Sequence, residues 1–170
     1  SVLIDTLLNR LQPAVRVRRT RSGQDAIALM LSGQGSHVVL PEPMASMLLW
    51  RNAQQHSGVH LHRVQSLESA WQLHFPMQPT LPQAGLMVNS SLSNNRSLSL
   101  AIEKAYAASC RWCKSETLQC AQLAHKYLPH IPIAVLQQAI AITHLESLPA
   151  SSVRTELEAL FQLIATRHPK

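Results

Sequence analysis

The stretch GQDAIALMLSGQGSHVVLPEPMASMLL, residues 23–49, decides the predicted fold of this 170-residue chain. Its apolar residues recur at helical spacing over residues 26–30 and then form a short continuous run over residues 37–40. From Met44 the helical spacing returns. This order predicts a helix, a buried strand and a second helix.

A carboxylate directly follows the predicted strand. Pro41 and Pro43 flank Glu42, and because proline cannot donate a hydrogen bond to a sheet, we expect the chain to leave the sheet there. Open parallel sheets bind their ligands at the carboxyl ends of strands. Glu42 is therefore a candidate binding residue.

Helix and strand patterns alternate through the first part of the chain. Residues 1–11 have one apolar helical face, and residues 15–18 alternate as a strand with one buried face. Together with residues 23–49 they predict an α/β fold with a largely parallel sheet and right-handed crossovers. Residues 60–64 and 85–89 are further predicted strands, and the chain from Ser97 onward is nearly all helical.

Four stretches, taken in order, resemble one known family. They are the E-P stretch at Glu42, R-V-x-S-L-x-x-x-W at 63–71, P-Q-A-G-L-M-V-N at 82–89, and the long helix that ends at Trp112. Their order and spacing are similar to the second lobe of periplasmic solute-binding proteins of ABC importers, in the nitrate, sulfonate and thiamine-precursor group. The resemblance implies the second lobe of a type 2 periplasmic-binding fold, a three-layer lobe followed by a helical C-terminal part.

The resemblance divides the chain into three parts. Residues 1–75 correspond to the second ligand-binding lobe without its first strand, residues 76–90 to an extended return crossover and strand, and residues 91–170 to helices that would pack on a first lobe. Nothing in the sequence resembles that first lobe. Because the helices would then expose an apolar face, we expect either a fragment of a longer protein or a homodimer that covers the face.

Proteins of this family make no bonds and close two lobes over a solute by a hinge motion. The resemblance therefore implies a periplasmic or extracellular binding component, with a lipid anchor as a further option, that presents a small polar solute to an ABC permease. A ligand-sensing or interaction module that reuses the fold is one alternative, and an enzyme of thiamine-precursor synthesis is another. No common catalytic, nucleotide-binding or zinc-protease motif occurs in the sequence, so we predict no enzyme and no cofactor.

Candidate ligand contacts follow from positions that match helix N-termini in the family, where free amides suit an anionic group. These positions are Ser1, Ser22, Gly23, Glu42 and Ser46. The serines could instead serve as helix caps, and Glu42 could accept bonds from nearby amides. Because the carboxylate of Glu42 would repel an anion, it favours a cationic or hydroxylated solute such as a pyrimidine precursor.

Two tryptophans could stack on a flat ligand. Trp71 and Trp50 each offer a large aromatic face. The alternative is that such a tryptophan belongs to the hydrophobic core. We add Trp71 to the candidate binding residues.

The remaining features argue against other classes of partner. The net charge of +6 would permit weak attraction to anions, but the arginine cluster at residues 16–21 contains no aromatic residue, so we predict no nucleic-acid binding. His60 and His62 share one face of a predicted strand, which is too few ligands for a metal site. No apolar run is long enough to span a membrane.

The three cysteines leave at least one thiol free within the chain. Cys110 and Cys113 have the CxxC spacing of metal or redox sites. They lie in a helical pattern with no second CxxC, and Cys120 follows one short segment later. We therefore favour buried helical cysteines over zinc binding.

Overall fold

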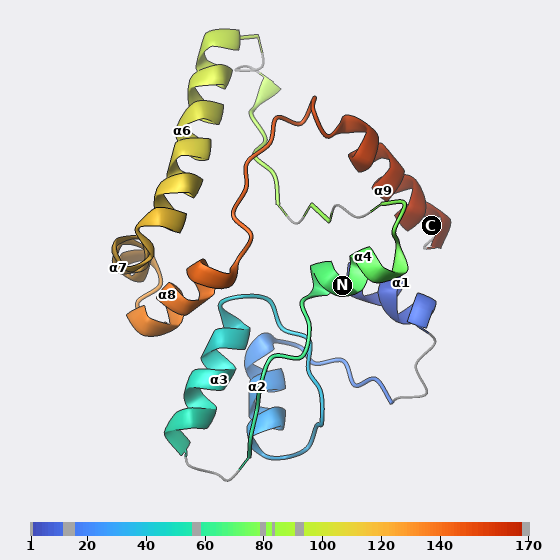
Figure 1. The fold of residues 1–170 in the computed structure, drawn as a ribbon, viewed down its shortest axis with the longest axis vertical. Coiled ribbons are helices and arrows are strands. Elements are labelled where there is room, and N and C mark those ends of the chain that lie inside the picture. Colours follow the sequence, from blue (N-terminus) through green and yellow to red (C-terminus); the bar gives the residue numbers. More distant parts are fainter. Residues whose placement is uncertain are drawn as a thin grey trace. The chain divides into compact units, whose positions relative to one another are not determined.

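The computed structural model describes residues 2–11, 16–55, 59–78, 81–82, 84–90 and 94–167. This part of the chain consists of helices and the segments that connect them (Figure 1). The helices are α1 (Val2–Leu11), α2 (Gly23–Leu31), α3 (Met44–Gln55), α4 (Leu67–His74), α6 (Arg96–Ser115), α7 (Thr117–Tyr127), α8 (Ile133–Ile142) and α9 (Arg154–Arg167). No residue within the described ranges belongs to a strand. The predicted α/β fold class with a parallel sheet, and with it the α/β solute-binding fold, is therefore wrong.

The segments with strand patterns have no regular secondary structure and join no sheet among the described residues. Residues 37–40 and 84–89 run as irregular connections, and Val39 is 58% exposed and Met87 95% exposed. A strand becomes stable when a neighbouring strand pairs with its backbone and its side chains are covered. The apolar runs therefore predicted buried strands that the part described by the structure does not contain.

The chain divides into two units that each combine distant segments. One unit consists of Ser1–Val17, Arg63–Leu100 and Leu148–Lys170, and the other of Arg18–His62 and Ala101–Ser147. The boundary between Leu100 and Ala101 therefore falls inside α6. The predicted functional parts, divided at residues 75 and 90, stay a prediction.

The first unit has a small core around one tryptophan. Here α1 packs against α4 and α9, and Trp71 is fully buried with Leu81 and Leu160. The indole stacks on the ring of Phe75 with 4.3 Å between ring centroids. Its Nε1 donates to the carbonyl oxygen of Gln78 at 2.9 Å. Trp71 thus has both its apolar surface and its single donor satisfied within the fold.

The second unit has the larger core, built by four helices. In this unit α3 packs against α2 and α8, and α7 packs against α8. The buried residues of this core are Ile27, Met30, Met47, Leu48, Ala121, Ile131, Val135 and Leu136. Apart from Ile131, which lies in the turn between α7 and α8, they belong to the helices, as expected when amphipathic helices bury a stripe against their neighbours.

Both ends of α2 are closed by local hydrogen bonds. The Ser22 side chain accepts from the backbone N–H of Asp25 at 3.1 Å, and the Asp25 carboxylate accepts from the N–H of Ser22 at 3.1 Å, which makes a capping box. At the other end, the N–H of Gln34 donates to the carbonyl of Leu29 at 2.9 Å, and Gly33 has a φ of 71°. This is a Schellman ending, in which glycine accommodates the left-handed turn.

The long helix α6 buries none of its side chains and is attached at its C-terminal turn. A disulfide joins Cys113 of α6 to Cys120 of α7. The Lys114 ammonium donates to the carbonyl oxygens of Ala141 at 3.2 Å and Thr143 at 3.0 Å, at the C-terminal end of α8. Neither α6 nor any other helix within the described residues is long and apolar enough to cross a membrane.

Candidate functional site

Four of the predicted site residues gather at the N-terminal ends of α2 and α3. Ser22 caps α2, and Gly23 begins it. A Cβ added to Gly23 would lie 3.3 Å from the Cε of Met44, the first residue of α3, so the two helix starts adjoin. The Glu42 carboxylate accepts from the N–H of the fully buried Ser46 at 3.2 Å. The structure therefore brings Ser22, Gly23, Glu42 and Ser46 together.

This end of the helix pair is already capped by the protein's own side chains. Asp25 and Glu42 each place a carboxylate on an amide of a helix start. An anionic solute would meet two like charges there, which disfavours its binding. Ser1 lies outside the described residues. Trp71, the remaining candidate, belongs to the core of the first unit.

A groove of about 620 Å³ lies between the C-terminal halves of the same two helices. Figure 1 shows α2 and α3 side by side and running in the same direction, with the connection between them returning from the end of one to the start of the other. The residues that line the groove are Ile27, Ala28, Leu31, Ser32, Trp50, Arg51, Gln54 and Gln55. The groove is therefore separate from the capped helix starts.

The spacing of the lining residues follows from helix geometry. Residues 27, 28, 31 and 32 of α2 and its cap, and residues 50, 51, 54 and 55 of α3, share the pattern i, i+1, i+4, i+5. Residues four apart on a helix lie on the same side. Two such quartets face each other across the groove. The α2 quartet is largely apolar, whereas the α3 quartet supplies an indole, a guanidinium and two primary amides.

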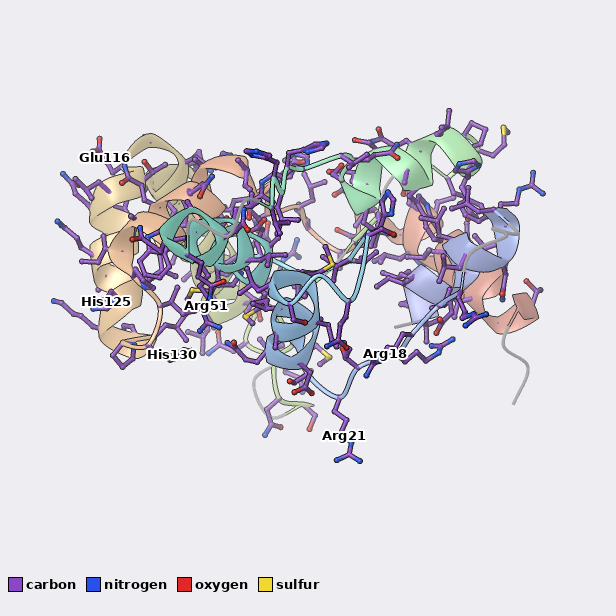
Figure 2. All side chains as sticks on the ribbon, turned by 90° about the horizontal axis from the view of Figure 1, so that it is seen from below. Arg18, Arg21, Arg51, Glu116, His125 and His130 are labelled. Atoms are coloured by element: carbon purple, nitrogen blue, oxygen red, sulfur yellow. A yellow bond between two sulfur atoms is a disulfide. The ribbon has the colours of Figure 1, made fainter. Side chains whose placement is uncertain are left out.

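Arg51 is the charged member of this lining set. It is half-buried on α3 (Figure 2), and its Nη1 donates to Oε1 of Gln24 on α2 at 3.0 Å. A guanidinium carries five N–H donors in a rigid plane, so this bond fixes the group and leaves most of its donors for other acceptors. None of the lining residues in the described part of the groove is acidic. The formal charge among the residues that line the groove is therefore the positive charge of Arg51.

Sequence reasoning named Trp50 as a stacking candidate but missed Arg51 and the two glutamines. The signal was present, because an aromatic residue and an arginine in sequence are followed one helical turn later by Gln54 and Gln55. What the sequence did not show is that the opposing quartet of α2 would lie against them. That arrangement depends on the packing of α2 against α3.

The comparisons with known proteins identify no relative of this chain. No family model, curated protein or solved structure matches the chain. The resemblance to solute-binding proteins thus rests on the short stretches around Glu42, Trp71, Val88 and Trp112.

The cysteines form a cross-link that sequence reasoning did not identify. Cys113 and Cys120 are joined with a Cα–Cα distance of 5.1 Å, and Cys110 is a half-buried free thiol. The available signal was the break between the two helices at Glu116, which lets the end of one helix and the start of the next approach. Within the described ranges, no group of three His, Cys, Asp or Glu side chains could hold a metal ion.

Proposed function

We propose that the chain is a solute-binding module that holds a small polar solute in the groove between α2 and α3. The observation that carries the proposal is the pair of facing quartets, which sets an indole, a guanidinium and two amides beside an apolar wall. Small-molecule sites have this make-up, with mostly apolar lining and a few polar groups that fix orientation. The volume of about 620 Å³ lies within the range of roughly 300–1,000 Å³ that such sites occupy.

The proposal places the module outside the cytoplasm. Disulfides persist in oxidising compartments such as the periplasm and the cell exterior, so the Cys113–Cys120 bond supports this location. Delivery of the solute to an ABC permease is the specific role that the sequence resemblance favours, and it stays a hypothesis. Since the expected sheet is absent from the described residues, the groove supports solute binding without any argument from that fold.

A blocked groove tests the proposal. Ala28 is exposed and lines the groove, so Ala28→Trp fills it from α2, whereas Ala108→Trp adds the same ring to an exposed position of α6. We expect members of a library of small polar solutes to stabilise the protein in thermal-shift assays, by about 2.7 kcal/mol at a hundredfold excess over Kd. The stabilisation should vanish in Ala28→Trp and persist in Ala108→Trp. A library without such a compound, or stabilisation that survives in Ala28→Trp, contradicts the proposal.

A second candidate function, an interaction module, is favoured by α6. Ile102 and Tyr106 lie four residues apart, on one side of this helix, and are 36% and 42% exposed. Neighbouring exposed apolar side chains of this kind are a common feature of protein interfaces. A second copy of the chain is the partner that the sequence predicts. Sedimentation that shows a monomer at all accessible concentrations would exclude the homodimer.

A further inference from the structure

We infer that the groove between α2 and α3 selects a flat ring that carries an anionic group, such as an aromatic carboxylate or sulfonate. The inference rests on the proposed function of the groove and adds the chemical class of the solute. It depends on three features, which are the surface of Trp50, the fixed guanidinium of Arg51 and the local electrostatics of the helix ends.

Trp50 supplies the surface for a ring. Its side chain is 37% exposed at the groove, while the preceding residues Ser46, Met47 and Leu48 are buried and hold α3 in place. Flat rings stack on an indole with a large contact area and little loss of conformational freedom. Ala28 and Leu31 of the facing helix add an apolar wall. A planar apolar body therefore fits this groove better than a strongly hydrated one.

Arg51 supplies the group for an anion. Because its Nη1 already bonds to Gln24 at 3.0 Å, the guanidinium is oriented before any solute arrives. Guanidinium groups bind carboxylates and related anions through two parallel N–H bonds, which are stronger than bonds between neutral groups. Trp50 and Arg51 are neighbours in the sequence and line the same groove. One small molecule can therefore reach both.

The end of α2 at the groove does not reverse this preference. The C-terminal carbonyls of a helix carry partial negative charge, which alone would repel an anion. At the end of α2, however, the carbonyls of Ala28, Leu29 and Met30 accept bonds from the backbone N–H groups of the Schellman turn. These bonds reduce the repulsion that the carbonyls would exert on an anion. The positive charge of Arg51 therefore sets the sign of the groove.

The carboxylates of this helix pair lie at its other end. Asp25 belongs to the first turn of α2, and Glu42 precedes α3 and bonds to its amide at Ser46. The expectation of a cationic or hydroxylated solute depended on Glu42. Because Glu42 is not among the residues that line the groove, it gives no reason to expect a cation there.

Four probes of matched size test the inference. Benzoate is flat and anionic, benzamide flat and neutral, benzylamine flat and cationic, and cyclohexanecarboxylate anionic but not flat. We expect benzoate to bind at least tenfold more tightly than each of the others in a titration followed by ligand-detected NMR. A tenfold difference in Kd corresponds to about 1.4 kcal/mol, which is within the range of a charge-assisted hydrogen bond or an aromatic stack.

Paired variants locate the binding. Arg51→Gln and Trp50→Leu should each weaken benzoate binding about tenfold or more. The matched controls are Arg111→Gln and Trp112→Leu on α6, where the tryptophan is as exposed as Trp50, and both should leave benzoate binding unchanged. Circular dichroism of every variant establishes that it is folded. The probe series on the unaltered protein tests the inference even if a variant fails to fold.

Each contrary result has a distinct meaning. Benzamide or benzylamine binding as tightly as benzoate would overturn the anionic part, and equal binding of cyclohexanecarboxylate would overturn the flat part. If none of the four probes binds but another solute is lost in Ala28→Trp, the inference fails while solute binding in the groove stands. If Ala28→Trp abolishes the binding of no solute, both the inference and the proposed function fail. If benzoate binds the Arg51→Gln and Trp50→Leu variants as tightly as the unaltered protein, its site lies outside the groove, and this result also overturns the inference.

Discussion

Helices α3 and α6 carry tryptophans of nearly equal exposure, Trp50 at 37% and Trp112 at 38%, in opposite settings. α3 buries three consecutive residues, two of them in the core of its unit, and lines a groove with α2. α6 buries none and is attached at its C-terminal turn. An exposed indole is therefore a weak guide to a binding site by itself. The difference lies in how firmly the helix beneath it is held.

The sharpest test of this comparison replaces one isoleucine in each setting. Ile27→Ala removes a fully buried core side chain of α2 that adjoins the groove, and we expect it to lower the free energy of unfolding by about 2 to 5 kcal/mol. Ile102→Ala removes the same atoms from an exposed position of α6 and should change it by about 0.5 kcal/mol or less. Chemical denaturation followed by circular dichroism measures both. Equal losses in the two variants would mean that α6 is packed as firmly as α2.

The disulfide is the next largest effect, because it is the covalent attachment of α6. Cys113→Ser opens a short loop and should lower the free energy of unfolding by about 2 to 3 kcal/mol in the loop-entropy description. Cys110→Ser, which alters the free thiol one turn earlier, is the control and should have little effect. Peptide mapping under non-reducing conditions identifies the bonded pair. A bond that involves Cys110 in the unaltered protein would contradict the assigned pairing.

The smallest effect concerns Lys114, the noncovalent attachment of α6. Lys114→Met removes two bonds to carbonyls at the end of α8 and should cost about 1 kcal/mol, since both bonds are exposed to solvent. Lys104→Met, on an exposed position of the same helix, is the matched control. Thermal unfolding of the pair measures the difference. Identical midpoints would show that these bonds add nothing to the attachment.

The helices were largely predictable from the sequence. The predicted helices at residues 1–11, after Ser22 and from Met44 appear as α1, α2 and α3. Their signals are local, because a helix bonds each residue to one four positions away and is started by a neighbouring cap. Ser22, which the sequence offered as a helix cap, forms a capping box with Asp25. Local chemistry was therefore sufficient for these elements.

The sheet could not be judged in the same way. Residues 37–40 have the apolar run of a buried strand, yet they are mostly exposed. A strand's bonds go to a partner elsewhere in the chain, and its own sequence does not reveal whether that partner is present. The pattern therefore described a tendency of the segment, and the described part of the chain does not provide the pairing that would fulfil it.

One residue of the candidate site was visible in the sequence. Trp50 was recognised as a ring-stacking residue, whereas Glu42 and Ser46 lie at the start of α3, outside the groove. The groove itself needed the contact between α2 and α3, since neither quartet is a site without the other. Arg51 gains its meaning from Gln24, 27 positions earlier. Such long-range pairs are beyond the reach of periodicity.

Because of the bond between Cys113 and Cys120, the covalent structure of a sample depends on the compartment in which the protein was expressed. Glutathione and thioredoxin keep thiols reduced in the cytosol, whereas a secreted product keeps its cross-links. One gene expressed by the two routes would therefore yield two covalently different molecules, which differ in mass by two hydrogens and in how the corner between α6 and α7 is closed.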